Sequence, residues 1–274
     1  MNPHLPVPTP SPSPSPTVAN TPGSEPVIRV NALKIGYQGK LVLREISFEV
    51  AQGEVFVILG GSGCGKSTLL KHLIGLHDPM EGEIWIGGEN LLAAQGDNRR
   101  RVLRKFGMMY QSGALFGSMT VLENVRLPLD AYTDLPDKAK DLVALSKLRL
   151  VGLGSAAQKM PSELSGGMQK RAAIARAMAL DPGILFLDEP SAGLDPVTSA
   201  GLDDLINELS EKFGITFVIV THELPSIFAI ADRVIMLDSH SKTIIAQGCP
   251  LALRDSSSDP WVRQFFNREA RAAG

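Results

Sequence analysis

The first part of the chain alternates between apolar and polar positions, which is the pattern of half-buried β-strands. The alternation runs through "VIRVNALKIGY" (residues 27–37) and "LREISFEV" (43–50), with the glycine of "YQGK" between them. A third segment, "GEIWIGGEN" (82–90), has the pattern of another hairpin arm. Together the three segments predict an antiparallel β-subdomain.

The second half of the chain carries near-continuous apolar runs, as strands buried on both faces of a parallel sheet require. These runs are "ILFLDEP" (184–190), "ITFVIVTHE" (215–223) and "RVIMLDS" (233–239). The segments between them, "TSAGLDDLINELSEKF" (198–213) and "ELPSIFAIAD" (223–232), have helical patterns. Strands that alternate with helices predict an α/β fold with a mostly parallel core sheet.

A glycine-rich segment, "GGSGCGKST" (60–68), lies between the predicted strand "EVFVIL" (54–59) and the predicted helix "STLLKHLIGL" (67–76). It fits G-x-x-x-x-G-K-[ST], and a strand, a glycine loop and a helix in this order are the context that the motif requires. A glycine-rich turn without a ligand is therefore the less favoured interpretation. The motif predicts binding of a nucleoside triphosphate but does not distinguish a kinase, a GTPase or a motor.

The chemistry of this loop follows from its residue types. Glycines let successive N–H groups point inward and let phosphate oxygens approach closely, and the helix N-terminus adds free N–H groups and a positive dipole end. Lys66 is expected to reach the β- and γ-phosphates, and the hydroxyl of Ser67 to ligate Mg²⁺. The residues expected to bind nucleotide here are Gly60, Gly61, Ser62, Gly63, Cys64, Gly65, Lys66, Ser67 and Thr68.

Residues 1–26 are low in complexity: they contain nine of the 19 prolines and no Lys or Arg. Such a segment buries too little apolar surface to order itself, so we expect a disordered Pro/Ser-rich tail. The whole chain, with 44% hydrophobic and 20% charged residues, has the composition of a soluble globular protein. No apolar run approaches the roughly 18 residues of a membrane helix, so any membrane role is expected to be peripheral.

The middle of the chain, residues 91–160, is more helical and polar. It contains one basic cluster, "RRRVLRKF" (99–106), which alone could suggest a nucleic-acid surface. The favoured interpretation is a solvated helix or loop face, because no second basic segment reinforces the cluster and the formal net charge is −2. We therefore expect no nucleic-acid partner.

Two carboxylates in tandem, Asp188 and Glu189, end the apolar run at 184–190. Downstream of a phosphate-binding loop, such a pair predicts a division of labour. Asp188 is expected to hold Mg²⁺, and Glu189 to orient and polarise the attacking water. His222 ends the next apolar run; a structural role and a contact beside the γ-phosphate are equally favoured for it by position alone.

The segment "LSGGMQKRAAIARAMAL" (164–180) predicts a helix with Ser165 as its N-cap and a bare N-terminus after it. Such a terminus is an anion site. Because the chain already has one phosphate-binding helix, this second one is explained if two chains dimerise head to tail and each helix closes over the other's ATP.

In this order, the motifs resemble those of the ATP-binding cassette (ABC) ATPase family across nearly the whole chain from Val27. "GGSGCGKST" is similar to the Walker A motif, "ILFLDEP" to the Walker B motif with its catalytic glutamate, and "LSGGMQK" to the family signature. "SAGLD" (191–195) resembles the D-loop, whose Asp195 would connect the two sites of a dimer. The resemblance implies a P-loop NTPase domain over 27–274, with a helical subdomain at about 107–178.

The resemblance also implies a set of site residues and cofactors. ATP and Mg²⁺ would lie between two copies of the chain. The catalytic residues would be Lys66, Gln111, Glu189 and His222. The metal ligands would be Ser67, Gln111 and Asp188. Tyr37 would stack on the adenine, and Ser165 and Gly167 of the second copy would contact the nucleotide.

Three segments are similar to the lipid-trafficking branch of the family, the maintenance-of-lipid-asymmetry systems. They are residues 111–129, 160–177 and 259–266, and they include Met168, where the common signature has glutamine. The resemblance implies an ATPase that drives phospholipid movement, located peripherally on the cytoplasmic face of the inner membrane. Its partners would be an integral-membrane permease and a lipid-binding protein with a mammalian-cell-entry (MCE) domain.

Two other functions remain open from the sequence. One is the ATPase of an ABC transporter for another substrate. The other is a soluble ABC ATPase that acts in DNA repair or on the ribosome; such proteins typically have coiled coils, zinc modules or two cassettes, which this sequence does not display.

Overall fold

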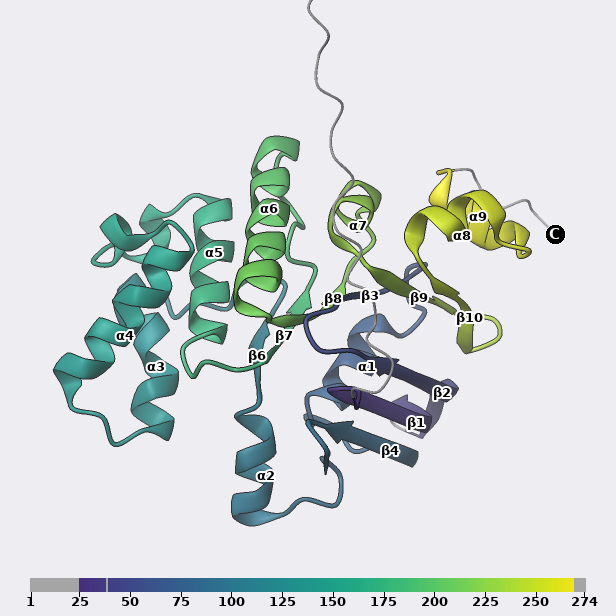
Figure 1. Ribbon diagram of the computed structural model, residues 1–274, viewed down its shortest axis with the longest axis horizontal. Coiled ribbons are helices and arrows are strands. Elements are labelled where there is room, and N and C mark those ends of the chain that lie inside the picture. The colour runs from purple at the N-terminus through teal and green to yellow at the C-terminus, as the bar shows by residue number, and fades with distance from the viewer. Residues whose placement is uncertain (1–24, 38, 269–274) are drawn as a thin grey trace, which may run out of the picture.

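The computed structural model describes residues 25–37 and 39–268 (Figure 1). The predicted tail lies outside these residues, apart from Glu25 and Pro26. The strands are β1 (Ile28–Tyr37), β2 (Lys40–Val50), β3 (Val55–Gly60), β4 (Glu81–Ile86), β5 (Glu89–Asn90), β6 (Phe106–Met109), β7 (Ile184–Asp188), β8 (Thr216–Val220), β9 (Arg233–Asp238) and β10 (Thr243–Gly248). The α-helices are α1 (Lys66–Leu73), α2 (Gly96–Leu103), α3 (Val121–Tyr132), α4 (Asp137–Leu150), α5 (Gly166–Ala177), α6 (Pro196–Phe213), α7 (Leu224–Ile230), α8 (Pro250–Ser256) and α9 (Pro260–Phe266).

The described strands form two sheets. One has four strands in the order β2-β1-β4-β5, and its strand pairs are antiparallel, which confirms the predicted antiparallel subdomain. The other has six strands in the order β10-β9-β3-β8-β7-β6. All its pairs are parallel except β9–β10, so the predicted mostly parallel core sheet is also confirmed.

The core sheet separates two apolar cores. Along β3, Val55, Val57 and Leu59 face one core, while Phe56 and Ile58 face the other. Strands β7 and β8 divide their side chains in the same way, which explains why their sequences are apolar at nearly every position. One core lies toward the antiparallel sheet and α1, and the other lies under the helices α3 to α7.

The helices α3, α4 and α5 gather at one end of the molecule, at the left of Figure 1. Helix α3 begins with a capping box in which Thr120 and Glu123 satisfy each other's backbone N–H groups. We expected a helical subdomain from about residue 107, but residues 107–109 belong to β6, which pairs with β7 in the core sheet. We therefore propose that this subdomain begins after Met109.

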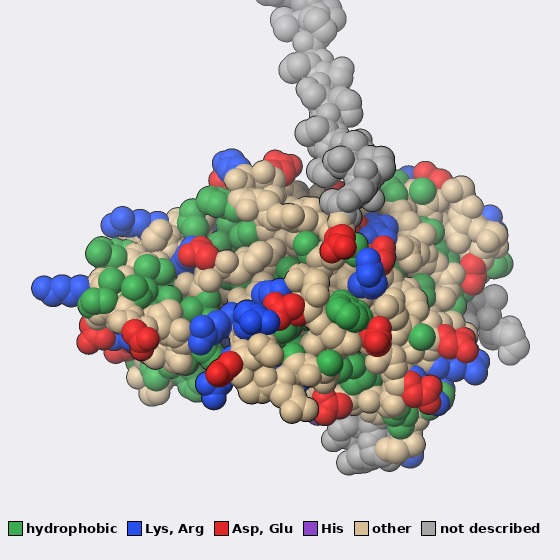
Figure 2. All heavy atoms as spheres, turned by 60° about the horizontal axis from the view of Figure 1, so that its bottom comes forward, with side chains coloured by type: hydrophobic (Ala, Val, Ile, Leu, Met, Phe, Trp, Pro, Cys, Tyr) green, Lys and Arg blue, Asp and Glu red, His purple; other side chains and the backbone are tan. Residues whose placement is uncertain are grey.

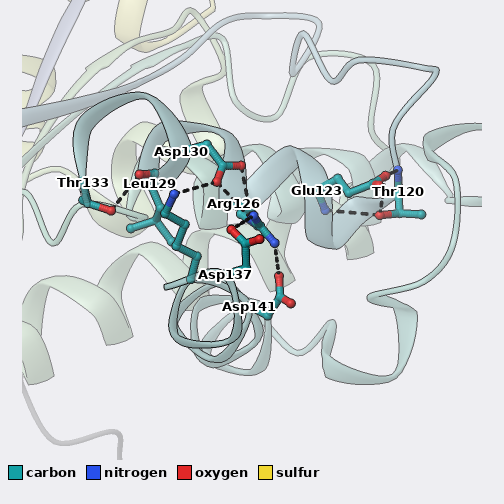
Figure 3. Close-up of polar contacts among 9 residues, drawn as sticks. Thr120, Glu123, Arg126, Leu129, Asp130, Thr133, Asp137 and Asp141 are labelled. Atoms are coloured by element: carbon teal, nitrogen blue, oxygen red, sulfur yellow. Dashed lines mark hydrogen bonds and ion pairs between the residues drawn. The ribbon is translucent and has the colours of Figure 1, made fainter. Parts of the chain in front are cut away.

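A charged network joins α3 to α4 (Figure 3). The Arg126 guanidinium donates to Asp130 on its own helix at 3.1 Å, and to Asp137 and Asp141 of α4 at 2.6 and 2.8 Å. Lys140 of α4 approaches Asp130 at 3.1 Å. The hydrogen bonds that Arg126 donates to Asp141 and Asp130 raise the pKa of the guanidinium. A guanidinium that donates to three carboxylates on two helices fixes the crossing of those helices more firmly than a single surface pair would.

Several elements lie outside the sequence predictions. Strand β6 falls within the region that we predicted to be helical and polar, and β10, α8 and α9 follow the last strand that we predicted. The basic cluster at 99–106 spans the end of α2 and the start of β6, and Arg101 and Lys105 both pair with Glu89. None of the helices in the described part of the chain combines the length and the apolar character that crossing a membrane requires.

Gly107 provides a test of how β6 is held against α5. A Cβ atom at this position would lie 2.0 Å from the carbonyl oxygen of Ala177, which is closer than atoms can approach. We expect Gly107→Ala to lower the free energy of unfolding by about 1–3 kcal/mol, because backbone must shift to admit the methyl group. Urea unfolding measures this change.

The matched control is Gly183→Ala, since a Cβ at Gly183 would meet nothing within 4 Å. This variant is expected to be neutral or slightly stabilising. Equal free energies of unfolding for the two variants would contradict the close packing of β6 on α5.

Candidate functional site

The predicted functional segments come together because parallel strands end at one edge of the core sheet. Asp188 lies opposite Val220, the residue two before His222, and Val220 lies opposite Ile58, two residues before the glycine loop. On the other side of β7, Met109 lies opposite Leu187, and Gln111 follows two residues later. The crevice beyond the carboxyl ends of the strands is where open α/β sheets bind ligands.

The glycine loop after β3 needs glycine at specific positions. Gly60 has φ 148°, and a Cβ there would lie 2.4 Å from the carbonyl oxygen of Leu237. Gly65 has φ 105° and is the N-cap of α1, with no side-chain hydrogen bond to the helix end. The N–H groups of the first turn of α1 have no partner within the helix and are available to an anion.

The side chains of this loop divide between the core and the surface. Ser62, Gly63 and Ser67 are exposed, as contact with a ligand requires. Cys64 is buried, and its burial raises the pKa of the thiol. Its side chain therefore belongs to the core, and only its backbone can contribute to the loop's ligand face.

Lys66 is bound within its own loop. Its ammonium group donates to the carbonyl oxygens of Gly60 at 2.8 Å and Gly61 at 3.1 Å. Both acceptors are neutral, so a phosphate oxygen would compete well for the ammonium group. The lysine is thus held at the loop until an anion replaces these carbonyls.

Asp188 and Glu189 each carry an oxygen that has no hydrogen-bond partner among the described residues. Asp188 Oδ1 and Glu189 Oε2 are buried, and none of the described residues donates a hydrogen bond to either. Burial raises the pKa of Asp188, the neighbouring Glu189 raises it further, and Lys71 and Lys66 oppose both effects. Buried carboxylate oxygens without donors are costly, so this pair is suited to a cation and a water molecule.

The backbone at Glu189 lies in the left-handed region, with φ 48°. This conformation is uncommon for a residue other than glycine. It is held by the hydrogen bond from the N–H of Glu189 to the carbonyl oxygen of Val220, at 2.8 Å, and Pro190 follows directly. The arrangement turns the glutamate side chain back toward the end of β8.

His222 lies two residues beyond the end of β8, a position that both of its sequence interpretations share. Its Nδ1 is 2.8 Å from Glu189 Oε1, and its Nε2 is 3.7 Å from a carboxylate oxygen of Glu223. The contact with the carboxylate favours the tautomer with the proton on Nδ1, which leaves Nε2 as an acceptor in the neutral ring. The side chain is 58% exposed, so a ligand can reach it.

Ser165 is the N-cap of α5, as predicted, and its Oγ accepts from the N–H of Met168 at 3.3 Å. Gly167 is buried, and a Cβ there would lie 2.3 Å from Cγ2 of Thr198 on α6. Close packing of α5 on α6 therefore requires this glycine. Within the described chain, no hydrogen bond joins Ser165 to the loop at 60–68.

Two further predicted residues have a defined place. Asp195 is the N-cap of α6, where its Oδ1 accepts from the N–H groups of Val197 and Thr198 at 3.1 and 3.0 Å. Tyr37 ends β1. The side chain of Tyr37, the expected contact to adenine, lies outside what the structure describes.

Lys170 and Arg176 of α5, which donate to backbone carbonyls between Gln111 and Ala114, are not among the residues predicted from the sequence. The signal for Lys170 was its place three and four residues before Ala173 and Ile174, which puts it on the apolar face of the signature helix. A lysine on a buried helix face is almost always paired with a hydrogen-bond acceptor, so this position predicts a partner.

The chain matches the ABC transporter family over residues 43–192, which is 150 of its 274 residues. It is 43% identical over 228 residues to the Escherichia coli protein "Intermembrane phospholipid transport system ATP-binding protein MlaF", covering 83% of this chain and 84% of that protein. It is 39% identical over 240 residues to the "Probable ribonucleotide transport ATP-binding protein mkl" of Mycobacterium tuberculosis, covering 88% of this chain and 66% of that protein.

A solved structure agrees with these matches. The dimeric, post-hydrolysis ATP-binding cassette MJ0796, bound to ADP and Pi, superposes with a TM-score of 0.73 at 30% sequence identity. The superposition covers 81% of this chain and 98% of that one. By the glycine loop, the paired carboxylates and these matches, the chain belongs to the ABC transporter family, as an ATP-hydrolysing subunit.

Proposed function

We propose that this chain is the ATPase subunit of an ABC transporter that moves phospholipids between membranes. The observation that carries the proposal is the 43% identity to MlaF, whose name assigns it to an intermembrane phospholipid transport system, over 83% of this chain. The resemblance of residues 111–129, 160–177 and 259–266 to the lipid-trafficking branch supports the same assignment.

In the proposed reaction, the loop at 60–68 and the N-terminus of α1 bind the phosphates of ATP, and Lys66 exchanges its carbonyl partners for phosphate oxygens. Glu189 accepts a proton from the attacking water, and His222 fixes the glutamate through Nδ1. Nε2 reaches the γ-phosphate as a donor only when the ring carries a proton on both nitrogens, because phosphate oxygens accept hydrogen bonds. Tyr37 stacks on the adenine.

We further propose that Ser67, Gln111 and Asp188 hold Mg²⁺. The buried Asp188 Oδ1, which accepts no hydrogen bond from the described residues, fits a hard cation, and so does the set of hydroxyl, amide and carboxylate oxygens. The ion would supply charge neutralisation on the phosphates when bound.

The site requires a second copy of the chain. In one copy, Ser165 and the start of α5 are not joined to the phosphate loop, yet they form a capped helix N-terminus that suits an anion. MJ0796 is dimeric with its hydrolysis products bound. We propose the same pairing here, in which Ser165 and Gly167 of each copy close over the nucleotide of the other.

A groove of about 490 Å³ beside the Gln111 segment is the proposed docking place of the permease. Its exposed aromatic residues are Tyr110, Phe116 and Tyr132, and Arg100 and Arg104 also line it. An apolar floor with cationic residues suits a short cytoplasmic helix of the permease that carries an acidic residue. This contact would hold the ATPase peripherally at the cytoplasmic face of the inner membrane, in a complex that includes an MCE-domain protein.

Two alternative functions are less well supported. The likeness to mkl, whose name states ribonucleotide transport, favours an ABC ATPase for another substrate, at lower identity. A soluble ATPase acting on nucleic acid would need a basic surface, but on the face in Figure 2 Lys and Arg side chains are interspersed with Asp and Glu.

Co-purification tests the membrane part of the proposal. The tagged chain is isolated from detergent-solubilised membranes and its partners are identified by mass spectrometry. A permease and an MCE-domain protein are expected, and the reconstituted complex should move fluorescent phospholipid between vesicles when ATP is added. A complex that transports nucleotides but no phospholipid would favour the mkl-like alternative, and recovery only with soluble or nucleic-acid partners would contradict both transport functions.

Glu189→Gln tests the assigned base. The amide is isosteric but cannot accept the proton of the attacking water, so kcat for ATP hydrolysis should fall about a hundredfold or more. The affinity for ATP should stay within about twofold, because binding relies on the glycine loop. Glu208→Gln, which removes an exposed carboxylate paired with Lys212 on α6, is the control and should hydrolyse ATP normally. Unchanged kcat in Glu189→Gln would remove this residue from the mechanism.

Phe116→Asp tests the groove. The side chain is 51% exposed and lines the groove, and loss of an aromatic anchor with gain of a charge should cut phospholipid transport about tenfold or more, while ATP hydrolysis continues. Phe213→Asp is the matched control, because Phe213 is 54% exposed but lies at the end of α6, away from the groove. If Phe116→Asp transports phospholipid as fast as the unsubstituted chain for the same ATP hydrolysis, the permease does not bind in this groove.

A further inference from the structure

One face of α5 lies along the backbone between Gln111 and Ala114. Arg176 donates to the carbonyl oxygens of Gly113 and Ala114, both at 2.7 Å. Three residues earlier, Ala173 faces Gly113, where a Cβ on the glycine would meet the alanine Cβ in ordinary van der Waals contact at 3.5 Å. Lys170, three residues earlier again, donates to the carbonyl oxygen of Gln111. The spacing of three puts all these contacts on one side of the helix.

Lys170 makes a second contact that Arg176 does not make. Its ammonium group also donates to the backbone carbonyl oxygen of Glu189, at 3.3 Å. One buried side chain of the signature helix therefore touches both the segment that begins with Gln111 and the backbone of the catalytic glutamate. Neither of its hydrogen-bond acceptors is a carboxylate.

The other buried lysine of this region shows the more usual solution. Lys147 of α4 is 8% exposed, and Lys170 is 7% exposed. The ammonium group of Lys147 pairs with the side-chain carboxylate of Asp181, in the loop between α5 and β7. A buried ammonium needs compensation, and an ion pair to an exposed carboxylate supplies it. Lys170 instead donates its hydrogen bonds to two backbone carbonyls, those of Gln111 and Glu189. Burial lowers the pKa of Lys170, and the nearby charges of Glu189 and Asp188 oppose that effect.

The backbones that these cations hold are in an uncommon conformation. Ala114 and Glu189 both have φ 48°, in the left-handed region, although neither is glycine. Such residues keep this conformation only where neighbouring groups fix them, and they concentrate at functional sites. Arg176 bonds to one of the two residues, and Lys170 to the other.

We propose that Lys170 is a positioning residue that ties the backbones of Gln111 and Glu189 to the signature helix, so that a shift of any of the three moves the others. It places the glutamate without touching nucleotide. The groove beside Gln111, the catalytic base, and the helix that closes on the second copy then form one mechanical unit. The inference rests on the ATP hydrolysis proposed above and is independent of the lipid as cargo.

Basal ATP hydrolysis by the purified full chain tests this role without a permease. Lys170→Met keeps the stem and removes the donors, Lys170→Gln restores a neutral donor, and Lys147→Met is the matched control for a buried lysine. We expect Lys170→Met to lower kcat by about tenfold to a hundredfold through misplacement of the base. The Kd of a fluorescent ATP analogue should stay within about twofold, since the glycine loop is intact.

Lys170→Gln should recover most of the lost kcat, because a carbonyl needs a donor rather than a charge, and Lys147→Met should keep both constants. Backbone amides in 111–114 and 189–192 should exchange with deuterium faster in Lys170→Met only. If that variant does not fold, Lys170→Leu takes its place as the donor-free variant.

Three results would overturn the positioning role. One is a kcat of Lys170→Met, or of its leucine replacement, within about twofold of the unsubstituted chain. Another is a loss that appears only in the Kd of the ATP analogue. The third is the same loss of kcat in Lys147→Met, which would mean that any buried lysine of this region acts through stability. If the Lys170 variants behave as expected but the complex moves no phospholipid, the lipid cargo is rejected and the positioning role of Lys170 stands.

Discussion

The burial of two adjacent carboxylates at the end of an apolar strand is the constraint on which the site depends. Strand β7 is buried up to Leu187, and Asp188 and Glu189 follow with one oxygen each that accepts no hydrogen bond from the described residues. The left-handed backbone at Glu189 lowers the stability of the folded state by about 1–3 kcal/mol. A fold that only had to be stable would not retain this combination, whereas a site that binds a cation and activates a water benefits from carboxylates that have little competing solvation.

The two-sided core makes that placement reliable. Because β3, β7 and β8 send alternate side chains into two separate apolar cores, a shift of register by one residue would exchange the two sets of side chains. The ends of the strands are therefore fixed, and with them the phosphate loop, the carboxylate pair and His222. Chain segments more than 150 residues apart in sequence meet within hydrogen-bonding distance of one another through this register alone.

The sequence predicted the strands that are apolar at nearly every position and the loops that end them, because both signals are local. It did not predict β6, whose four residues are mostly half-buried and form a strand only by pairing with β7. It assigned Gly167 to a ligand, and the structure adds that Thr198 of α6 leaves no room for a side chain there. The proposed role of Lys170 could not be predicted because its contacts are not local: its acceptors are 59 residues before it and 19 after it.

The catalytic edge and the groove contribute differently to what the chain does. We propose that the phosphate loop and the carboxylates carry out ATP hydrolysis whatever the cargo, so they bear on the reaction and not on the transported substrate. Discrimination among partners has to lie where the chain meets them, and in the proposed docking groove an apolar floor and cationic residues would select a matching helix. Helix α5 runs between these regions: its N-terminus suits the second copy's nucleotide, and Arg176 near its end holds the carbonyls beside the groove. We propose that a displacement at the groove reaches Glu189 through this packed helix and the two hydrogen bonds of Lys170, with no local unfolding between the groove and the glutamate.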